Sequence, residues 1–332
     1  MGKTKVAVLG FGFIGKIHCK AVENSSTGEL LGIWTQPDKT AKEFSKLYPD
    51  KRLFSTPEEL VDDPDVDAVV IGLPNVHHHP LAMRAMEQGK HVLVEKPMAM
   101  TVAEAEEMAA LAQRKGVSLM VAHMWRFDRE ARALREVVDS GRLGELVKTK
   151  SYGIHENWGP AGWFVKKELA GGGALIDMGV HAIDTTRYLL GDPDPVSVYA
   201  VVETRYGDYN VDDAGVLVIR WSNGVTSIVE SGWWNSHMDG PEASTQIFGK
   251  KGYGRLFPTM AKFSPMEDPW LPKFPLRADH CEQPMYDLQM AEFLDAVAHG
   301  RMAVPGPAEG LVVMKIAEAA YRSAETGTVV KL

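Results

Sequence analysis

The stretch GFGFIG, residues 10–15, follows a short run of aliphatic residues and comes directly before a segment with helical periodicity. Glycines at this spacing between a strand and a helix are typical of a turn that binds a dinucleotide. The first permits a tight turn, the second lets the backbone approach a pyrophosphate, and the third lets helix and strand pack closely. The N-terminus of the helix would offer free amides to the anion. We therefore expect a dinucleotide to bind at Gly10, Gly12, Phe13, Ile14 and Gly15.

The segments around this turn alternate between strand and helix over the first ~120 residues. Short runs rich in Val, Leu and Ile predict strands at 5–9, 30–35, 68–73, 91–95 and 118–123. Helical stretches separate them, and strands that are apolar on both faces are typical of a parallel sheet covered by helices on both sides. The sequence thus predicts an α/β fold class, with a doubly wound, Rossmann-type dinucleotide-binding domain over residues 1–123.

A different pattern begins after residue 123. Longer strands of alternating polarity are predicted at 145–154, 195–206, 214–221, 225–234 and 244–249, and Asn223-Gly224 between two of them is a strong hairpin signal. Strands joined by tight turns are antiparallel. We expect residues 124–332 to form an α+β domain, with a large, mostly antiparallel open sheet, for substrate binding and oligomerisation. Its helices are predicted at 174–190, 283–298 and 307–325, and the last two could pack back on the first domain. Residues 258–284 are predicted to form a long irregular loop.

Composition excludes several classes of protein. Of the 332 residues, 45% are apolar and 24% are charged, the values of an ordinary globular protein. The 36 basic and 44 acidic residues give a net charge of −8 without any basic run, so we expect no nucleic-acid partner. Apolar stretches are too short to cross a bilayer, so we expect no membrane association. Cys19 and Cys281 lie far apart, and we expect two reduced thiols in a cytoplasmic protein.

The end of the second predicted strand bears on the choice of cofactor. Dinucleotide-binding domains usually place an acidic residue there, ~20 residues after the turn, to bind the ribose 2′-hydroxyl. The positions here are Thr35 and Gln36, and neither is acidic, so a 2′-phosphate would not be repelled. We expect Thr35 and Gln36 to contact NAD or NADP, with a slight preference for NADP.

Two polar segments follow the strands predicted at 68–73 and 91–95. Since ligands of doubly wound sheets bind at the carboxyl ends of the strands, these segments would border the dinucleotide. They contribute the further cofactor-binding residues that we expect, Pro74, Asn75, His78, Glu95 and Lys96. At a strand end of this kind, Lys96 differs from an ordinary surface lysine and becomes a candidate for chemistry.

The segment GGGALIDMGVHAID, residues 171–184, carries an acid–base pattern. Asp177 and His181 are four residues apart and would share one helix face, which Asp184 would share too. A carboxylate beside an imidazole orients the ring and raises its pKa, which is the arrangement that proton transfer needs. A capping aspartate with a packing histidine would give the same pattern. The consecutive histidines at 77–79 cannot all face one ion, and we expect no metal site.

Together these motifs resemble the Gfo/Idh/MocA family of NAD(P)-dependent sugar and polyol oxidoreductases. The resemblance rests on residues 10–15, Pro74-Asn75 with the adjacent histidines, Glu95-Lys96-Pro97, Gly162-Trp163-Phe164 and residues 171–184, and it covers nearly the whole chain. It implies that Lys96, Asp177 and His181 are catalytic. It also implies hydride transfer between a nicotinamide and a hydroxyl or carbonyl carbon of a sugar, polyol or derivative, and a homodimer or homotetramer formed through the open sheet. The threonine at position 35, Thr35, differs from the residue of a typical member of this family.

Substrate contacts are expected from polar and aromatic residues that follow predicted strands. They are His123, Arg126, His155, Asn157 and Trp158, together with Asp177 and His181. Trp158 would stack on a sugar ring or, equally, pack in a core.

The motifs leave the chemistry open at two points. Either His181 or Lys96 would transfer the hydroxyl proton, and in the first case Lys96 would stabilise charge on the reacting oxygen. Two other functions are also compatible with a dinucleotide site, a sensing regulator without turnover and a redox-assisted NAD-dependent glycosidase. The presence of Lys96, Asp177 and His181 favours an enzyme over a regulator.

Overall fold

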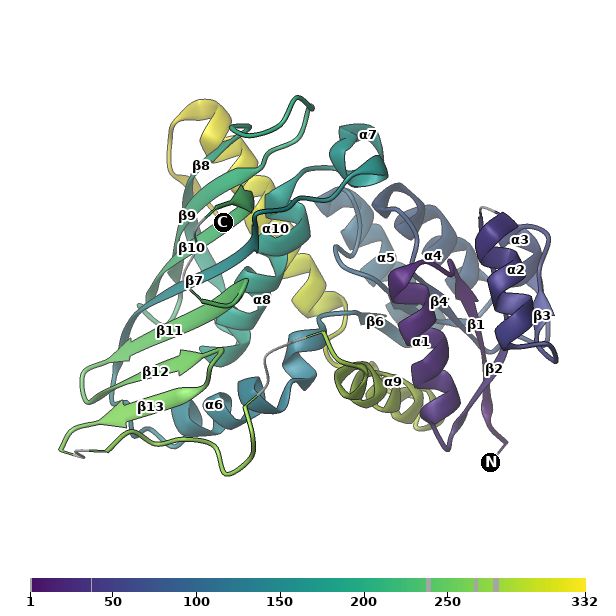
Figure 1. The fold of residues 1–332 in the computed structure, drawn as a ribbon, viewed down its shortest axis with the longest axis horizontal. Coiled ribbons are helices and arrows are strands. Elements are labelled where there is room, and N and C mark those ends of the chain that lie inside the picture. Colours follow the sequence, from purple (N-terminus) through teal and green to yellow (C-terminus); the bar gives the residue numbers. More distant parts are fainter. Residues whose placement is uncertain (1, 37, 237–239, 266–267, 277–280) are drawn as a thin grey trace. The chain divides into compact units, whose positions relative to one another are not determined.

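The computed structural model describes residues 2–36, 38–236, 240–265, 268–276 and 281–332 (Figure 1). The chain forms two compact units. The first unit comprises residues 1–124 and 281–311, and the second unit comprises residues 125–280 and 312–332. The first unit therefore includes a helix from near the C-terminus, α9 (Gln283–Ala298).

The first unit contains a parallel sheet that has six strands among the described residues, in the order β3-β2-β1-β4-β5-β6. The strands are β1 (Thr4–Leu9), β2 (Gly28–Trp34), β3 (Arg52–Leu53), β4 (Ala68–Ile71), β5 (His91–Val94) and β6 (Leu119–Val121). The helices along this part of the chain are α1 (Phe13–Asn24), α2 (Asp38–Leu47), α3 (Pro57–Asp62), η1 (Asn75–His77), α4 (His78–Glu87) and α5 (Val102–Lys115). Every residue of β4 is buried, as a sheet covered on both faces requires, so the predicted doubly wound architecture is confirmed.

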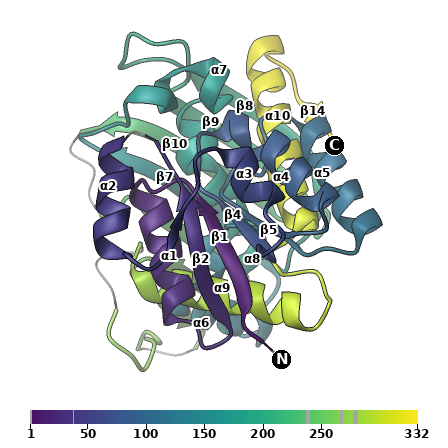
Figure 2. The same cartoon turned by 90° about the vertical axis from the view of Figure 1, so that its right-hand side faces the viewer.

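The strand order creates a switch point between β1 and β4. The chain leaves β1 for β2 on one side and returns to β4 on the other, and right-handed crossovers then place α1 and α4 on opposite faces of the sheet. α9 packs beside α1, where the Gln283 side-chain amide donates to the Ile17 carbonyl at 3.1 Å, and α5 packs beside α4 (Figure 2). Ligands of such sheets bind beside the switch point, at the carboxyl ends of the strands.

The second unit contains a mixed sheet that has eight strands among the described residues, in the order β13-β12-β11-β7-β10-β9-β8-β14. Its strands are β7 (Leu146–Glu156), β8 (Pro195–Glu203), β9 (Ala214–Trp221), β10 (Thr226–Asn235), β11 (Ala243–Gly249), β12 (Gly252–Leu256), β13 (Met260–Phe263) and β14 (Val330–Lys331). β7 and β10 run parallel, and the other pairs are antiparallel. Asn223-Gly224 forms the predicted hairpin between β9 and β10, with Gly224 at a φ of +86°. The expected, mostly antiparallel sheet is confirmed.

Helices cover one face of this sheet (Figure 1). They are α6 (Arg129–Asp139), α8 (Val180–Leu189) and the part of α10 (Pro307–Thr326) that belongs to the second unit. The core lies between, where Ile183 and Ile316 from the helices meet Leu217 and Val229 from the strands. Alternate residues of β8 and β9 point to the opposite face and are exposed; they include Tyr199, Val201, Val216 and Val218.

Two predicted segments differ from the structure. The helix expected at 174–190 is divided into a π-helix, η4 (Leu175–Gly179), followed by α8. The loop expected at 258–284 contains β13, and Ala261 also bridges to Trp270, so part of it extends the sheet. Within the described part of the chain, every helix is too short or too polar to cross a membrane.

Candidate active site

The turn at residues 10–15 of the first unit has the geometry of an anion site. Gly10 has a φ of +100°, and a Cβ atom there would lie 2.5 Å from the Gly72 carbonyl oxygen. A Cβ atom at Gly15 would lie 2.1 Å from the Gly10 carbonyl oxygen, whereas one at Gly12 would meet open space. No side chain caps α1 at Gly12, so its first-turn amides are available to a pyrophosphate. The residues of this turn therefore fit a dinucleotide.

Thr35, at the end of β2, is turned towards this glycine turn. Its side chain is buried, and its Oγ1 accepts a hydrogen bond of 3.1 Å from the Phe11 amide and lies 3.0 Å from the Thr40 Oγ1. The Thr35 side chain therefore stabilises the backbone of the glycine turn at Phe11. Gln36, the other residue predicted here, is exposed.

His78, expected at the cofactor, is fully buried instead. Its Nδ1 lies 2.8 Å from the Pro97 carbonyl oxygen and its Nε2 lies 2.9 Å from the Leu73 carbonyl oxygen. Burial lowers the pKa of His78, and a neutral ring donates to one of the two carbonyls at a time. The ring thus ties the segment after β4 to the segment after β5, at the residue that follows Lys96.

The Glu95 carboxylate is bound by other residues of the first unit. Its Oε1 lies 2.8 Å from Nε2 of His18 on α1, and its Oε2 accepts from the Lys96 amide at 3.2 Å. Burial alone would raise the pKa of Glu95, but His18 and the charge of Lys96 hold it below its ordinary value. The buried His18 carried no sequence signal beyond its place on the helix after the glycine turn. Of the other predicted residues here, Asn75 and His123 are buried, while Pro74 and Lys96 are half-buried.

In the second unit, Asp177 lies on η4, whose start is fixed by Asp212. The Asp212 carboxylate accepts from the amides of Gly173 and Leu175, both at 2.8 Å, and from the Tyr321 hydroxyl at 2.6 Å. A Cβ atom on Gly173 would lie 1.8 Å from the Asp212 carbonyl oxygen, so only glycine fits this approach. A π-turn carries more residues than an α-turn, which changes the direction of the side chains it bears and is common at functional sites.

The Asp177 carboxylate contacts two rings from neighbouring strands. Its Oδ2 accepts a hydrogen bond of 3.1 Å from Nε1 of Trp233, which is buried on β10. The same oxygen lies 3.4 Å from Nε2 of His155 on β7. His181 is buried as well, and its ring centre lies 4.8 Å from that of Trp125. Of the predicted substrate residues, the structure therefore brings His155 to Asp177.

Glu242 joins this group, although no sequence motif marks it. Its Oε2 lies 3.0 Å from Nδ1 of His155, and its Oε1 accepts from Nε1 of Trp158 at 2.6 Å. The Trp158 ring stacks on the His155 ring with centroids 3.6 Å apart. Asn157 is exposed, and its side-chain amide donates to Glu156 at 3.2 Å. Glu242 directly precedes β11, and only the fold reveals its position beside His155.

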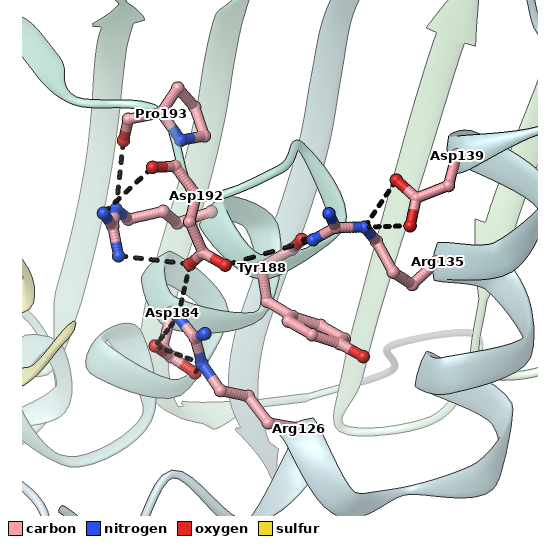
Figure 3. Close-up of polar contacts among 8 residues, drawn as sticks. Arg126, Arg135, Asp139, Asp184, Tyr188, Asp192 and Pro193 are labelled. Atoms are coloured by element: carbon pink, nitrogen blue, oxygen red, sulfur yellow. Dashed lines mark hydrogen bonds and ion pairs between the residues drawn. The ribbon is translucent and has the colours of Figure 1, made fainter. Parts of the chain in front are cut away.

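Arg126 and Asp184 form a buried ion pair, in contrast to the predicted substrate contact at Arg126 (Figure 3). The Arg126 Nε donates to both Asp184 oxygens at 3.0 and 2.9 Å, and its Nη2 donates to Asp184 and to Asp192, each at 2.8 Å. Burial would lower the pKa of Arg126, but the two carboxylates raise it above its ordinary value. The Arg126 and Asp184 side chains therefore bind each other, and their ion pair holds the segment that contains Trp125 against α8. Among the described residues, no group of three or more His, Cys, Asp or Glu side chains is arranged to hold a metal ion.

Comparison with known proteins identifies the chain. Residues 4–123 match the oxidoreductase family with an NAD-binding Rossmann fold, and residues 131–255 match the GFO/IDH/MocA C-terminal domain. A 1,5-anhydro-D-fructose reductase from Ensifer adhaerens is 31% identical over 78% of this chain and 80% of its own length. The chain belongs to the GFO/IDH/MocA family. The resemblance inferred from the motifs is therefore confirmed, and the protein is an oxidoreductase.

Other members of the GFO/IDH/MocA family match over nearly the full length. D-glucoside 3-dehydrogenase from Escherichia coli (strain K12) is 28% identical over 99% of this chain and 97% of its own. Levoglucosan dehydrogenase, in a complex with NADH and levoglucosan, superposes with a TM-score of 0.87 at 26% identity and covers 99% of both chains. Both units of this protein thus have counterparts in sugar dehydrogenases.

Proposed function

We propose that this enzyme transfers a hydride between a nicotinamide dinucleotide and a hydroxyl-bearing or carbonyl carbon of a cyclic sugar, polyol or derivative. The observation that carries the proposal is the match over 99% of both chains to levoglucosan dehydrogenase with NADH and levoglucosan. The described side chains agree with it, because the uncapped start of α1 suits a pyrophosphate and the group around Asp177 is rich in hydrogen-bonding and aromatic residues.

Within this function, the chain's own residues bind, orient and move a proton. Gly10, Gly12, Phe13, Ile14 and Gly15 hold the pyrophosphate, and Gln36 contacts the adenosine ribose. When bound, the nicotinamide accepts or gives the hydride. His181 takes the hydroxyl proton, Asp177 orients His181, and Lys96 donates a hydrogen bond to the reacting oxygen as negative charge develops on it.

A substrate panel tests the function and the choice of cofactor together. Purified enzyme is mixed with cyclic polyols, aldoses and glycosides, with NAD and NADP in parallel, and nicotinamide absorbance is followed. We expect turnover with both dinucleotides and a slight preference for NADP, because neither Thr35 nor Gln36 repels a 2′-phosphate. Tight dinucleotide binding without turnover on any substrate would favour a regulator, and aglycone release without net NADH would favour a glycosidase.

The pH profile of His181→Ala tests the assignment of the proton. We expect kcat to fall by about 10²–10⁴-fold and the limb of the profile that belongs to His181 to disappear. Unchanged turnover with an unchanged profile would remove His181 from this role and move the proton transfer to Lys96.

We also propose that the enzyme is a homodimer or homotetramer, assembled through the exposed face of the second unit's sheet. The support is the pairing of Tyr199 with Val218 and of Val201 with Val216 on neighbouring strands, all four exposed. Among the described residues, Cys19 and Cys281 are not joined in a disulfide, which fits the reducing cytoplasm where we propose that the enzyme is located.

A further inference from the structure

Oxidation of an alcohol by a dinucleotide releases one proton in every turnover. The side chain that takes this proton must return it to water before the next cycle. Asp177, in the second unit, has a side chain that is only 11% exposed, so a proton in its neighbourhood needs a path outward. The structure contains a chain of titratable groups that begins at this carboxylate.

His155 is the centre of that chain. Its Nε2 lies 3.4 Å from Oδ2 of Asp177, and its Nδ1 lies 3.0 Å from Oε2 of Glu242. An imidazole accepts a proton on one nitrogen and releases it from the other, so a ring between two carboxylates is the arrangement of a proton path. The longer contact is of the kind that tightens when substrate binds. The Glu242 side chain is 37% exposed and therefore reaches solvent.

The contacts around His155 hold this geometry in place. The Glu156 amide and Nε1 of Trp158 both donate to Oε1 of Glu242, at 2.8 and 2.6 Å, which leaves Oε2 to face the ring. The Trp158 ring covers one face of the His155 ring. Among the described residues, Asp177 and Glu242 are the charged groups at the ring nitrogens of His155, since Glu156 turns its carboxylate to the Asn157 amide.

We propose that His155 and Glu242 carry the reaction's proton between Asp177 and solvent. This inference rests on the proposed dehydrogenase function. In oxidation, the C–H electron pair leaves as hydride to the nicotinamide, and the O–H bond breaks. The proton passes through its first acceptor to Asp177 and then to Nε2 of His155. Nδ1 releases a proton to Glu242, which gives it to water. Before the next turnover the ring returns to its starting tautomer by proton exchange with water, which gives one proton to Nδ1 and takes one from Nε2, and reduction uses the path in reverse.

Glu242→Gln tests the path, because glutamine keeps an oxygen for Trp158 and the Glu156 amide but does not take up a proton. We expect steady-state turnover to fall by about tenfold, with proton release as the slow step. The single-turnover rate of hydride transfer should be unchanged, and the substrate deuterium isotope effect on kcat should shrink towards one. Imidazole buffer at high concentration should restore turnover, because it accepts the proton in place of Glu242.

Two further variants serve as controls. Glu242→Asp keeps a carboxylate and should retain most of the turnover and the wild-type response to buffer. Glu145→Gln removes an exposed carboxylate of the same unit, paired with Lys250, and should behave as wild type. Equal losses of single-turnover and steady-state rates in Glu242→Gln, without rescue by imidazole, would overturn the proposal, as would normal turnover. Failure of the dehydrogenase function itself would be distinct, because the wild-type enzyme would then show no hydride transfer at all.

Discussion

Arg126 and Glu95 are buried charged side chains that each contact a titratable partner. Arg126 meets Asp184 and Asp192, with side-chain exposures of 5% for Arg126 and 2% for Asp184, and Glu95 meets His18. A buried charge without a partner is costly, so each of these pairs constrains the segments that carry it. Trp125, whose ring packs beside that of His181, and Lys96, which we propose to contact the reacting oxygen, are direct neighbours of the paired residues Arg126 and Glu95 in the sequence. The buried pairs therefore constrain the backbone at Trp125 and Lys96.

Arg126→Gln should destabilise the protein by about 3–5 kcal/mol, because it leaves the carboxylate of Asp184 buried without its cation. The free energy of unfolding, measured in urea by fluorescence, checks this. Arg205→Gln is the matched control, since Arg205 pairs with Glu203 on the surface and should contribute less than about 1 kcal/mol. Equal effects of the two substitutions would contradict the account.

Glu95 should make stability depend on pH in the acid range. Its pKa in the folded protein lies below the ordinary value of 4.5, so its contribution is present above that value and is lost as pH falls through the lowered one. Glu95→Gln should therefore reduce the loss of stability below pH 4.5. Urea unfolding at a series of pH values measures the free energy of unfolding of each variant. Glu58→Gln is the control, because Glu58 is exposed. If the free energy of unfolding of Glu95→Gln and of wild type changed with pH in parallel, the prediction would be refuted.

At the scale of elements, the function depends on how two helices begin. α1 begins without a side-chain cap at Gly12, which leaves its amides for an anion. η4 begins at a site where Asp212 binds the amides of Gly173 and Leu175, and this contact sets where Asp177 points. In both places a glycine, Gly15 in the first and Gly173 in the second, allows backbone atoms to approach where a Cβ atom would not fit.

Gly173→Ala should displace η4, because the new Cβ atom would lie 1.8 Å from the Asp212 carbonyl oxygen. A shift of about 1 Å in Asp177 is expected to lower kcat by about 100-fold. Dinucleotide binding, measured by NADH fluorescence, should stay within about twofold of wild type, because the glycine turn belongs to the first unit. Wild-type kcat in this variant would show that η4 tolerates the change.

At the scale of the whole molecule, no helix among the described residues covers one face of the second unit's sheet (Figure 1). On β8 and β9, exposed residues of this face alternate with core residues such as Val198 and Leu217. Tyr199, Val201, Val216 and Val218 form an apolar patch there that is in register across the two strands. An apolar patch of this kind is stabilised in water when a second copy covers it.

Val216→Lys should therefore dissociate the assembly, since it places a charge in the middle of this face. Light scattering after size-exclusion chromatography should show a fall in mass to that of a smaller species. Leu47→Lys, on α2 of the first unit, replaces an equally exposed apolar residue and should leave the mass unchanged. A wild-type protein that elutes with the monomer's mass would refute assembly through this face.

Much of the fold and part of the site could be predicted from the sequence. The glycine turn, the apolar strands around it and Asn223-Gly224 are local signals, and they predicted a parallel sheet followed by a mostly antiparallel one. The strand-end motif at Lys96 and the pattern of Asp177 and His181 are local as well. The hydrogen-bond partners of a side chain are not local signals. Thr35 and His78 were predicted to bind the cofactor and Arg126 the substrate, and the structure shows their side chains bound to backbone groups or, for Arg126, to a buried carboxylate.

The fold class, the family and the anion-binding turn follow from the amino-acid sequence alone, because these depend on spacing and periodicity within short stretches of chain. The folded structure was needed to show that Asp177 lies on a π-turn, that His155 lies between Asp177 and Glu242, and that Asp184 binds Arg126. The physical reason is that burial and pairing join residues far apart in the chain. His155 and Glu242 are 87 positions apart, and no local pattern records that β7 and the start of β11 are neighbours.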